Sequence, residues 1–371
     1  MEHDNLTWRI AFSSLRGLRP ELAQMLLARA GSEQAFFNLT EGQLSALMGF
    51  KNRLFSDSLR GRALDRAAAE AEFIRANSIT PLYFLDPDYP NRLLQCDDAP
   101  LMLYGLGTCD LNDAHFISIV GTRHATVYGT DFVTRLVEDI AAKTTGNVVI
   151  VSGLAYGIDI AAHRAALRTG LPTIAVLAHG LSTIYPATHR SDAVEIVRRG
   201  GMLLTDYTSA EPIHRGNFLA RNRIVAGLSD CLIVAESADK GGALVTARLA
   251  AGYDRDVMAL PGRVTDRYSA GCNSLIAGNI AALITSADDL FSHMGWAVRE
   301  PEGTQKTLFE TLTPDEETII SILTDIGEAS MTDLTTRLDI PTPRLMGMLI
   351  DMEFRSLIAH IPGGRYRAIL T

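Results

Sequence analysis

The stretch VVIVSGLAYGIDIAAHRAAL, residues 148–167, combines a strand pattern, a glycine turn and a helix pattern. Val148–Val151 is a run of β-branched apolar residues, which is typical of a strand buried on both faces, and it ends at Ser152 and Gly153. Ile158–Leu167 is rich in alanine and carries an acid in its first turn, which predicts a helix. Such a turn leaves backbone amides unpaired at the positive end of the helix, where a phosphate can bind. The stretch therefore predicts either an anion site or, more simply, glycines that only permit the turn.

Two further glycine turns have a cation beside them. Arg123 lies next to a turn that starts at Gly121, and Lys240 precedes Gly241 and Gly242. Each turn follows a predicted strand, so backbone donors and a charged side chain should meet at one edge of a sheet. This combination favours phosphate as the ligand. It would suit a small nucleotide as well as a polynucleotide.

The segment HRGNFLARNRIVAGL distinguishes these two ligands. If it is helical, Phe218, Arg221 and Asn222 share one face, and Arg215 lies just before them. An aromatic ring can stack on any base while arginines contact the phosphates, as single-stranded nucleic acid requires. The alternative is that Phe218 belongs to the core and that Arg221 or Arg223 pairs with an acid across the sheet.

Asp159 and His163 are four residues apart on the predicted helix and could form an acid/base pair. Nucleotide phosphoribohydrolases have similar glycine-turn sheets, but their G-G-x-G-T-x-x-E phrase is replaced here by P-G-R-V-T-D-R at residues 261–267. We therefore expect Asp159 to stabilise the helix start and His163 to pack against the sheet. The sequence predicts no catalytic residue and no metal site, and an enzyme acting on a nucleotide or its ribose is the alternative hypothesis.

The elements that must position these residues are strands alternating with helices from residue 79 onward. This pattern predicts a doubly wound, mostly parallel α/β sheet of the Rossmann-like type, whose ligands bind outside the carboxyl ends of the strands. The G-x-G-x-x-G and G-x-x-x-x-G-K-[ST] motifs are absent, so we expect no dinucleotide cofactor and no P-loop ATPase. The predicted strands are Pro81–Leu85, Met102–Tyr104, Phe116–Val120, Val148–Val151, Thr173–Leu177, Gly201–Thr205, Cys231–Ala235, Val257–Ala259 and Ile280–Ile284.

Composition limits the class of protein. The chain has 371 residues, 47% of them hydrophobic, and a formal net charge of −9, which argues against a generally basic protein but allows a local basic groove. Its four cysteines are widely spaced and should be reduced and mostly buried. Without an apolar run of membrane-spanning length, we expect a soluble cytoplasmic protein with no membrane contact.

The pattern divides the chain into four parts. Residues 1–76 are predicted to be helical. A phrase at Arg16 is similar to a helix-hairpin-helix turn, and we interpret it as having a structural or protein-contact role. Residues 77–292 form the Rossmann-like domain and 293–310 a linker. Residues 311–371 predict three helices and a hairpin, a winged helix. Nine acids and five arginines give this part a net charge of −4, so we expect it to contact protein or simply to pack against the rest of the chain, rather than to bind DNA.

Several long phrases resemble the DprA/Smf family of bacterial DNA-processing proteins. They cover most of residues 80–290 in the family's order, and this is far more specific than any single glycine motif. The phrases are SIVGTRHATVYG, VVIVSGLAYGIDIAAHRAAL, TIAVLAHGLSTIYPATHR, NFLARNRIVAGLSDCLIVAES, GGALVTARLA, and ALPG followed by GCNSLIAGN.

The resemblance implies a non-enzymatic protein that binds single-stranded DNA during natural transformation. It further implies a homodimer that hands DNA to the RecA recombinase. One departure is Gly241, where relatives often have serine, and another is Leu219-Ala220, where many have proline or a basic residue. The residues that the resemblance assigns to the phosphate pocket are Gly121, Arg123, Ser152, Gly153, Lys240 and Gly242, and those assigned to the adjoining nucleotides are Arg215, Phe218, Arg221 and Asn222.

Overall fold

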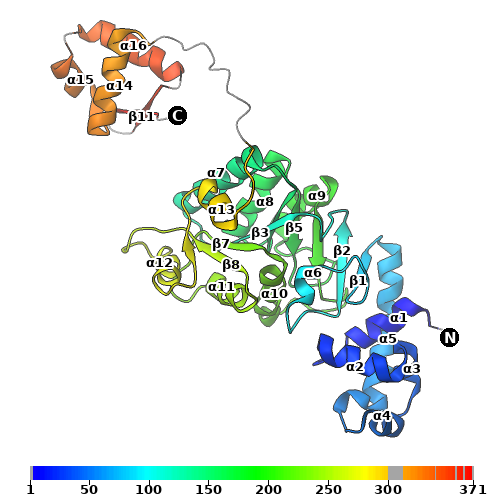
Figure 1. Ribbon diagram of the computed structural model, residues 1–371. Helices are drawn as coiled ribbons and strands as arrows, with labels where there is room; N and C mark the ends of the chain where they lie inside the picture. The colour runs from blue at the N-terminus through cyan, green and yellow to red at the C-terminus, as the bar shows by residue number, and fades with distance from the viewer. Residues whose placement is uncertain (1–2, 300–311, 339, 356, 362–363, 370–371) are drawn as a thin grey trace. The chain divides into compact units, whose positions relative to one another are not determined.

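The computed structural model describes residues 3–299 and 312–369, except 339, 356, 362 and 363. It divides into two compact units, Met1–Arg299 and Glu300–Thr371. The larger unit contains the predicted sheet and the predicted N-terminal helices (Figure 1).

A nine-stranded sheet forms the centre of the larger unit, with the strand order β1-β2-β6-β5-β4-β3-β7-β8-β9. All nine predicted strands are present. β1 and β2 run antiparallel to their neighbours and the remaining pairs are parallel, which confirms the mostly parallel α/β fold. The strands are β1 Thr80–Tyr83, β2 Met102–Gly107, β3 His115–Val120, β4 Val148–Ser152, β5 Thr173–Val176, β6 Met202–Thr205, β7 Cys231–Val234, β8 Asp256–Ala259 and β9 Ala282–Leu283.

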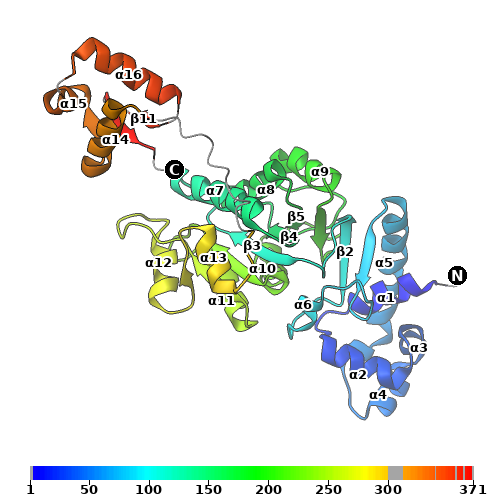
Figure 2. The ribbon, with the colours of Figure 1, turned by 45° about the horizontal axis from the view of Figure 1, so that its top comes forward.

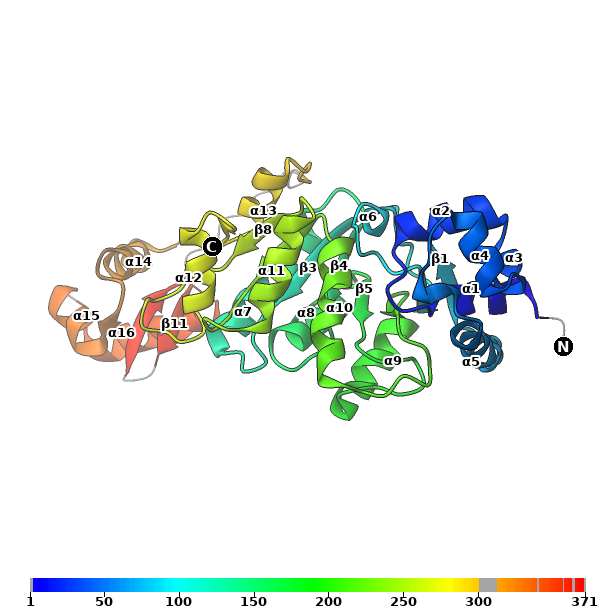
Figure 3. The ribbon, with the colours of Figure 1, turned by 90° about the horizontal axis from the view of Figure 1, so that it is seen from below.

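Helices cover both faces of this sheet, which explains why its central strands are apolar throughout. One face is covered by α7, α8, α9 and α13, and the other by α10, α11 and α12 (Figures 1 and 2). Figure 3 shows α10 and α11 side by side along the second face. The helices are α6 Asn91–Leu94, α7 Val127–Lys143, α8 Ile158–Thr169, α9 Arg190–Arg198, α10 Arg215–Leu228, α11 Gly242–Gly252, α12 Ala270–Ala277 and α13 Ala287–Met294, and a short 3-10 turn, η2, spans Ala187–His189.

The N-terminal residues are helical, as predicted, and the last of their helices ends at Ala76. Arg60 is buried among them and donates hydrogen bonds to the carbonyls of Phe36, Phe37, Leu39 and Phe55, which joins three segments. The elements are α1 Asn5–Ser13, α2 Pro20–Ala30, α3 Glu33–Asn38, α4 Glu41–Met48, η1 Arg53–Phe55 and α5 Asp57–Ala76.

Polar contacts connect these helices to the sheet. Arg9 of α1 pairs with Asp86 at 2.9 Å, and the carboxylate of Glu70 on α5 accepts hydrogen bonds from the backbone amide and hydroxyl of Ser209. The apolar core is also continuous from α1 into the sheet. The helices therefore form part of the same compact unit as the sheet.

The predicted linker starts later than residue 293. His293 lies in α13 and contacts Asp256 at 3.0 Å, and the Trp296 ring stacks on His115 with 4.1 Å between centroids. These contacts attach residues up to Arg299 to the sheet unit. Residues 300–310, the rest of the predicted linker, lie outside the described residues.

The smaller unit has the predicted three helices and hairpin strands. A short strand after the first helix joins them in a three-stranded antiparallel sheet of order β10-β12-β11. The winged-helix assignment stays a prediction, and residues 362–363 of its predicted turn lie outside the described residues. The elements are α14 Pro314–Ile326, β10 Ala329–Ser330, α15 Met331–Arg337, α16 Thr342–Phe354, β11 Ile358–Ile361 and β12 Arg365–Ala368.

Candidate functional site

The strand order creates one crevice at the carboxyl edge of the sheet. From β3 the chain builds the sheet outward through β4, β5 and β6, whereas β7, β8 and β9 lie on the other side of β3. β3 and β7 are neighbouring parallel strands, so the loops that follow them start side by side. The two loops then lead to opposite sides of this strand pair. Ligands of open α/β sheets bind at such a reversal of strand order. Arg123 lies in the first of these loops and Lys240 in the second.

Three loops at this edge are held together by their backbones. The amide of Thr122 donates to the carbonyl of Glu236 at 2.7 Å, and the amide of Ile158 donates to the carbonyl of Thr122 at 3.2 Å. Gly157 has a φ of +77°, and a Cβ there would lie 2.2 Å from the Thr122 carbonyl oxygen. Gly121 is equally confined, because a Cβ would lie 2.4 Å from Cγ1 of Ile158. These glycines allow the loops after β3, β4 and β7 to pack closely.

The buried side chain of Glu236 holds the start of α7 beside these loops. Its carboxylate accepts hydrogen bonds from the amide of Thr126 at 2.8 Å and from the Thr126 hydroxyl at 2.5 Å. Thr126 is the N-cap of α7, so the acid fixes the start of that helix against β7. The carboxylate of Glu236 is thus used at the start of α7, and no ion pair between it and Arg123 or Lys240 is found among the described residues.

Arg123 and Phe218 form the exposed part of the site. The guanidinium of Arg123 lies over the Phe218 ring, 5.3 Å from its centroid. The ring of Tyr185 lies 5.6 Å from that of Phe218, between centroids, and the two ring planes are inclined at 60°. Phe218 is half-buried, whereas Arg123 and Tyr185 are exposed. Within residues 3–299 and the described part of 312–369, Arg123 pairs with no carboxylate. An unpaired cation and an accessible aromatic ring therefore lie together at the sheet edge.

Arg221 does not lie on this surface, contrary to the prediction that it contacts nucleotides. Its side chain is 4% exposed and donates a hydrogen bond to the carbonyl of Val176. A Cβ at Gly153 would lie 2.1 Å from Nη1 of Arg221, so the guanidinium lies directly beneath the turn after β4. The prediction failed because helical spacing places Arg221 near Phe218 but does not show which of the two faces the sheet. We assign Arg221 a positioning role.

Ser152 is also buried, and its hydroxyl donates to the carbonyl of Ile119 at 2.6 Å. It joins β4 to β3 and is not directed into the crevice. The amide of Gly153 is used as well, since it donates to Oδ2 of Asp159 at 3.2 Å. These two residues, predicted to line a phosphate pocket, shape the turn instead of presenting donors to solvent.

Asp159 and His163 occupy the positions that we expected from the sequence. The carboxylate of Asp159 holds the turn before α8, and burial raises its pKa while the nearby Arg221 opposes that shift. Burial likewise lowers the pKa of Arg221, opposed by Asp159. His163 is fully buried, with Nδ1 2.7 Å from the Thr173 hydroxyl, and burial lowers its pKa to about 3. A buried neutral histidine bonded to threonine is suited to packing rather than proton transfer.

The remaining predicted residues lie on the surface. Arg215 and Lys240 are exposed, and neither has an ion-pair partner in the part of the chain that the structure describes. Asn222 is half-buried on α10. Gly242 is the first residue of α11, and the N-cap Gly241 provides no side chain to cap the helix. The amide of Leu244 donates to the carbonyl of Gly241, so the amides of Gly242 and Ala243 are the ones that remain available to an anion.

Arg223 pairs with Asp206 at 2.5 Å. This agrees with the alternative interpretation of the sequence, in which Arg221 or Arg223 pairs with an acid. Tyr185 is a site residue that the sequence reasoning missed. Tyr185 lies in the loop after β5, within one of the phrases that resemble the family. An aromatic residue in a loop that follows a predicted strand was the signal that the sequence offered, and the structure shows its ring exposed beside Phe218.

Among the described residues there is no group of histidine, cysteine or acidic side chains that could hold a metal ion. The four cysteines are free and buried, as expected. None of the described helices is both long enough and apolar enough to cross a membrane.

The mostly parallel sheet with helices on both faces places the protein in the class of Rossmann-like α/β proteins. The comparisons with known proteins define the family. Residues 80–295 match the family model described as DNA recombination-mediator protein A. A putative DNA processing protein DprA of Mycobacterium tuberculosis is 32% identical over 95% of this chain and 92% of its own length. The chain therefore belongs to the DNA recombination-mediator protein A family.

Other relatives agree with this assignment. The DNA processing protein DprA of Streptococcus pneumoniae is 34% identical over 72% of this chain and 92% of its own length. Its X-ray structure superposes with a TM-score of 0.63 at 30% identity, covering 79% of this chain and 98% of that one. A structure of DNA processing protein A from Helicobacter pylori, described for its single-stranded DNA binding mode, has a TM-score of 0.51 at 30% identity and covers 58% of this chain and 95% of that one.

Proposed function

We propose that this protein binds single-stranded DNA at the carboxyl edge of its sheet and acts without catalysing a reaction. The observation that carries the proposal is the pairing of Arg123 with the Phe218 ring beside the switch point. The ring offers a face on which a base of any identity can stack, and Arg123 can contact the adjoining phosphate. The H. pylori relative, whose structure is described for single-stranded DNA binding, supports the same ligand class.

The structure refines the list of residues that would contact DNA. Lys240, Gly242 and the first amides of α11 would hold a phosphate, and Gly121 would shape the loop that presents Arg123. Arg215, Asn222 and Tyr185 would surround the base on Phe218. Ser152, Gly153 and Arg221 lie beneath this surface and would fix its shape.

Titration of the full chain with labelled oligothymidylate, with the matching duplex in a parallel series, tests this proposal. We expect tighter binding of the single strand and similar affinity for unrelated sequences, because the site has few side chains that could read base edges. Assaying the same samples for breakdown of nucleoside monophosphates tests the alternative enzyme. Nucleotide breakdown without DNA binding would replace our proposal with that enzyme.

By family resemblance, we further propose that the protein is a homodimer that loads RecA on incoming single strands during natural transformation. The description of the matched family as a recombination mediator supports this role. Light scattering would measure the dimer. RecA-catalysed ATP hydrolysis on strands covered by single-strand-binding protein should start sooner when this protein is present, and an unchanged lag would contradict the loading role.

A further inference from the structure

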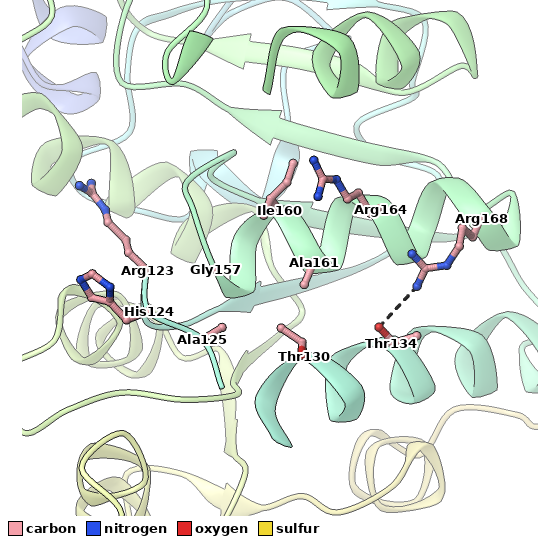
Figure 4. A pocket seen from close by; sticks show the side chains of 10 residues that line it. All are labelled: Arg123, His124, Ala125, Thr130, Thr134, Gly157, Ile160, Ala161, Arg164 and Arg168. Atoms are coloured by element: carbon pink, nitrogen blue, oxygen red, sulfur yellow. Dashed lines mark hydrogen bonds between the residues drawn. The ribbon is translucent and has the colours of Figure 1, made fainter. Parts of the chain in front are cut away.

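A groove of about 400 Å³ lies between α7 and α8 and begins at the candidate DNA site. At one end it is lined by Arg123, His124 and Gly157, and it continues along α8 past Arg164 to Arg168 (Figure 4). Three of its ten lining residues are arginines, and none of the ten is an aspartate or a glutamate. The groove is therefore a basic channel that leads away from the crevice on a protein with a net charge of −9.

Helical spacing explains why the polar groups line up. Arg164 and Arg168 are four residues apart on α8, and Thr130 and Thr134 are four apart on α7, so each pair lies on one face of its helix. Figure 4 shows these four side chains on the two helices, with Arg168 directed toward Thr134. From Gly157 to Arg168 the helix rises roughly 16 Å, at 1.5 Å per residue. That length exceeds what one phosphate needs.

The arginines differ in how far nearby acids neutralise them. Arg164 makes two hydrogen bonds to the carboxylate of Asp192, at 2.9 and 3.0 Å, and its charge is compensated. Arg168 only approaches Glu138 at 4.0 Å and donates one long hydrogen bond, 3.4 Å, to the Thr134 hydroxyl. Its side chain is 53% exposed. Of the two arginines on α8, Arg168 is therefore the one that an incoming phosphate can recruit at lower cost.

We propose that this groove carries the backbone phosphates of a single strand that leaves the Arg123 site. The inference rests on the proposed DNA-binding function and extends it by a path of defined direction along α8. Arg168 would contact phosphate, with the hydroxyl of Thr134 as a further donor. The Thr130 hydroxyl already donates to the carbonyls of Thr126 and Val127. The only ring among the groove's lining residues is that of His124, at the Arg123 end, so the rest of the groove, lined by Ile160 and Ala161 among others, has no ring on which a base could stack. The bases would point toward solvent, and the groove should bind any sequence.

Oligonucleotide length provides the test, because a short strand fills only the Arg123 site and a longer one also enters the groove. The full chain is titrated with labelled oligothymidylates of about 6 and about 15 nucleotides, a range that spans usual single-strand site sizes. The variants are Arg168→Glu and, as a matched control, Arg135→Glu, which makes the same charge change at an exposed position of α7 outside the groove. Melting temperatures verify that both variants are folded.

We expect Arg168→Glu to bind the longer strand about fivefold or more weakly, with a salt slope lower by about 0.7 per lost phosphate contact, and to bind the shorter strand normally. Arg135→Glu should change neither affinity by more than about twofold, because its charge lies off the path. Unchanged binding of the longer strand by Arg168→Glu would overturn the inference. So would an equal loss at both lengths, or an equal loss in the control.

A third variant distinguishes an error in the groove proposal from an error in the proposed Arg123 site. Arg123→Ala is measured with the same two strands and should weaken both. If it weakens neither, the Arg123 site is wrong, while the difference between lengths for Arg168→Glu still decides the groove. If Arg123→Ala weakens both and Arg168→Glu weakens neither, only the groove is refuted.

Discussion

A Cβ atom on Gly153 would lie 2.1 Å from Nη1 of Arg221, closer than two such atoms can approach. The turn after β4 therefore contains glycine at this position because a buried guanidinium lies against it. Arg221 in turn donates to the carbonyl of Val176 on β5, so one side chain braces two neighbouring strands. The family resemblance assigned both Gly153 and Arg221 to the DNA site, and the structure shows that the turn at Gly153 packs directly on the buried Arg221 side chain.

Gly153→Ala should consequently destabilise the protein and disturb DNA binding together. The added methyl group must displace the Arg221 guanidinium or the loop, and overpacking of this kind costs about 1–3 kcal/mol. The loop after β4 is bonded to the loop that holds Arg123, so we also expect weaker single-stranded DNA binding. Thermal unfolding and oligonucleotide titration measure the two effects.

Gly242→Ala is the matched control for the effect of Gly153→Ala on stability. A Cβ at Gly242 would meet no atom within 4 Å, and alanine in the first turn of α11 is a better helix former. Its stability should stay equal or rise by up to about 1 kcal/mol. If Gly153→Ala were as stable as Gly242→Ala, the close packing of Gly153 on Arg221 would not hold in solution.

The sequence predicted the sheet well because its strands are short apolar runs bounded by glycine or polar turns. All nine are present, and so is the helix that begins at Ile158. Prediction was weaker for individual side chains, since spacing along α10 groups Phe218 with Arg221 but does not determine which one faces the core. Trp296 shows the same limit at a boundary, because no local pattern reveals that its ring stacks on His115, which lies far away in the chain. Contacts of this kind depend on tertiary packing.

Arg123→Ala and Lys240→Ala should each weaken binding of single-stranded DNA without unfolding the protein. Both side chains are exposed, and neither pairs with a carboxylate in the part of the chain described by the structure, so neither supports the fold. Each lost phosphate contact should lower the salt slope of binding by about 0.7 for a single strand. Affinity and salt slope that stay unchanged in both variants would refute the phosphate site.

The buried His163 should make the protein less stable in mild acid. Burial lowers its pKa to about 3 from an ordinary value of 6.5, so below pH 6.5 the unfolded chain binds a proton that the folded chain excludes. This contribution to stability is present above pH 6.5 and is lost as the pH falls toward 3. Between pH 7 and 5 the loss from this group amounts to roughly 2 kcal/mol.

Denaturant unfolding of the wild type and of His163→Gln at pH 7 and 5 isolates this effect, because the other titrating groups are shared. The wild type should lose more free energy of unfolding than the variant over this interval. Equal losses in the wild type and in His163→Gln would mean that His163 binds a proton in the folded protein.

Phe218 separates a DNA-contacting role from a packing role most sharply. Its ring is half-buried between Arg123 and Tyr185, so Phe218→Ala should remove a stacking surface and cost roughly 1–3 kcal/mol in binding. Folding should suffer much less than the about 3–5 kcal/mol typical of a fully buried phenylalanine. Phe218→Trp should retain most of the affinity, since any aromatic face can stack on a base. DNA titration and thermal unfolding of both variants distinguish the two roles. The packing role would be supported if Phe218→Ala had a much lower melting temperature and its folded fraction kept the wild-type affinity. Phe218 would then not belong to the site, and the cations alone would hold the DNA by charge.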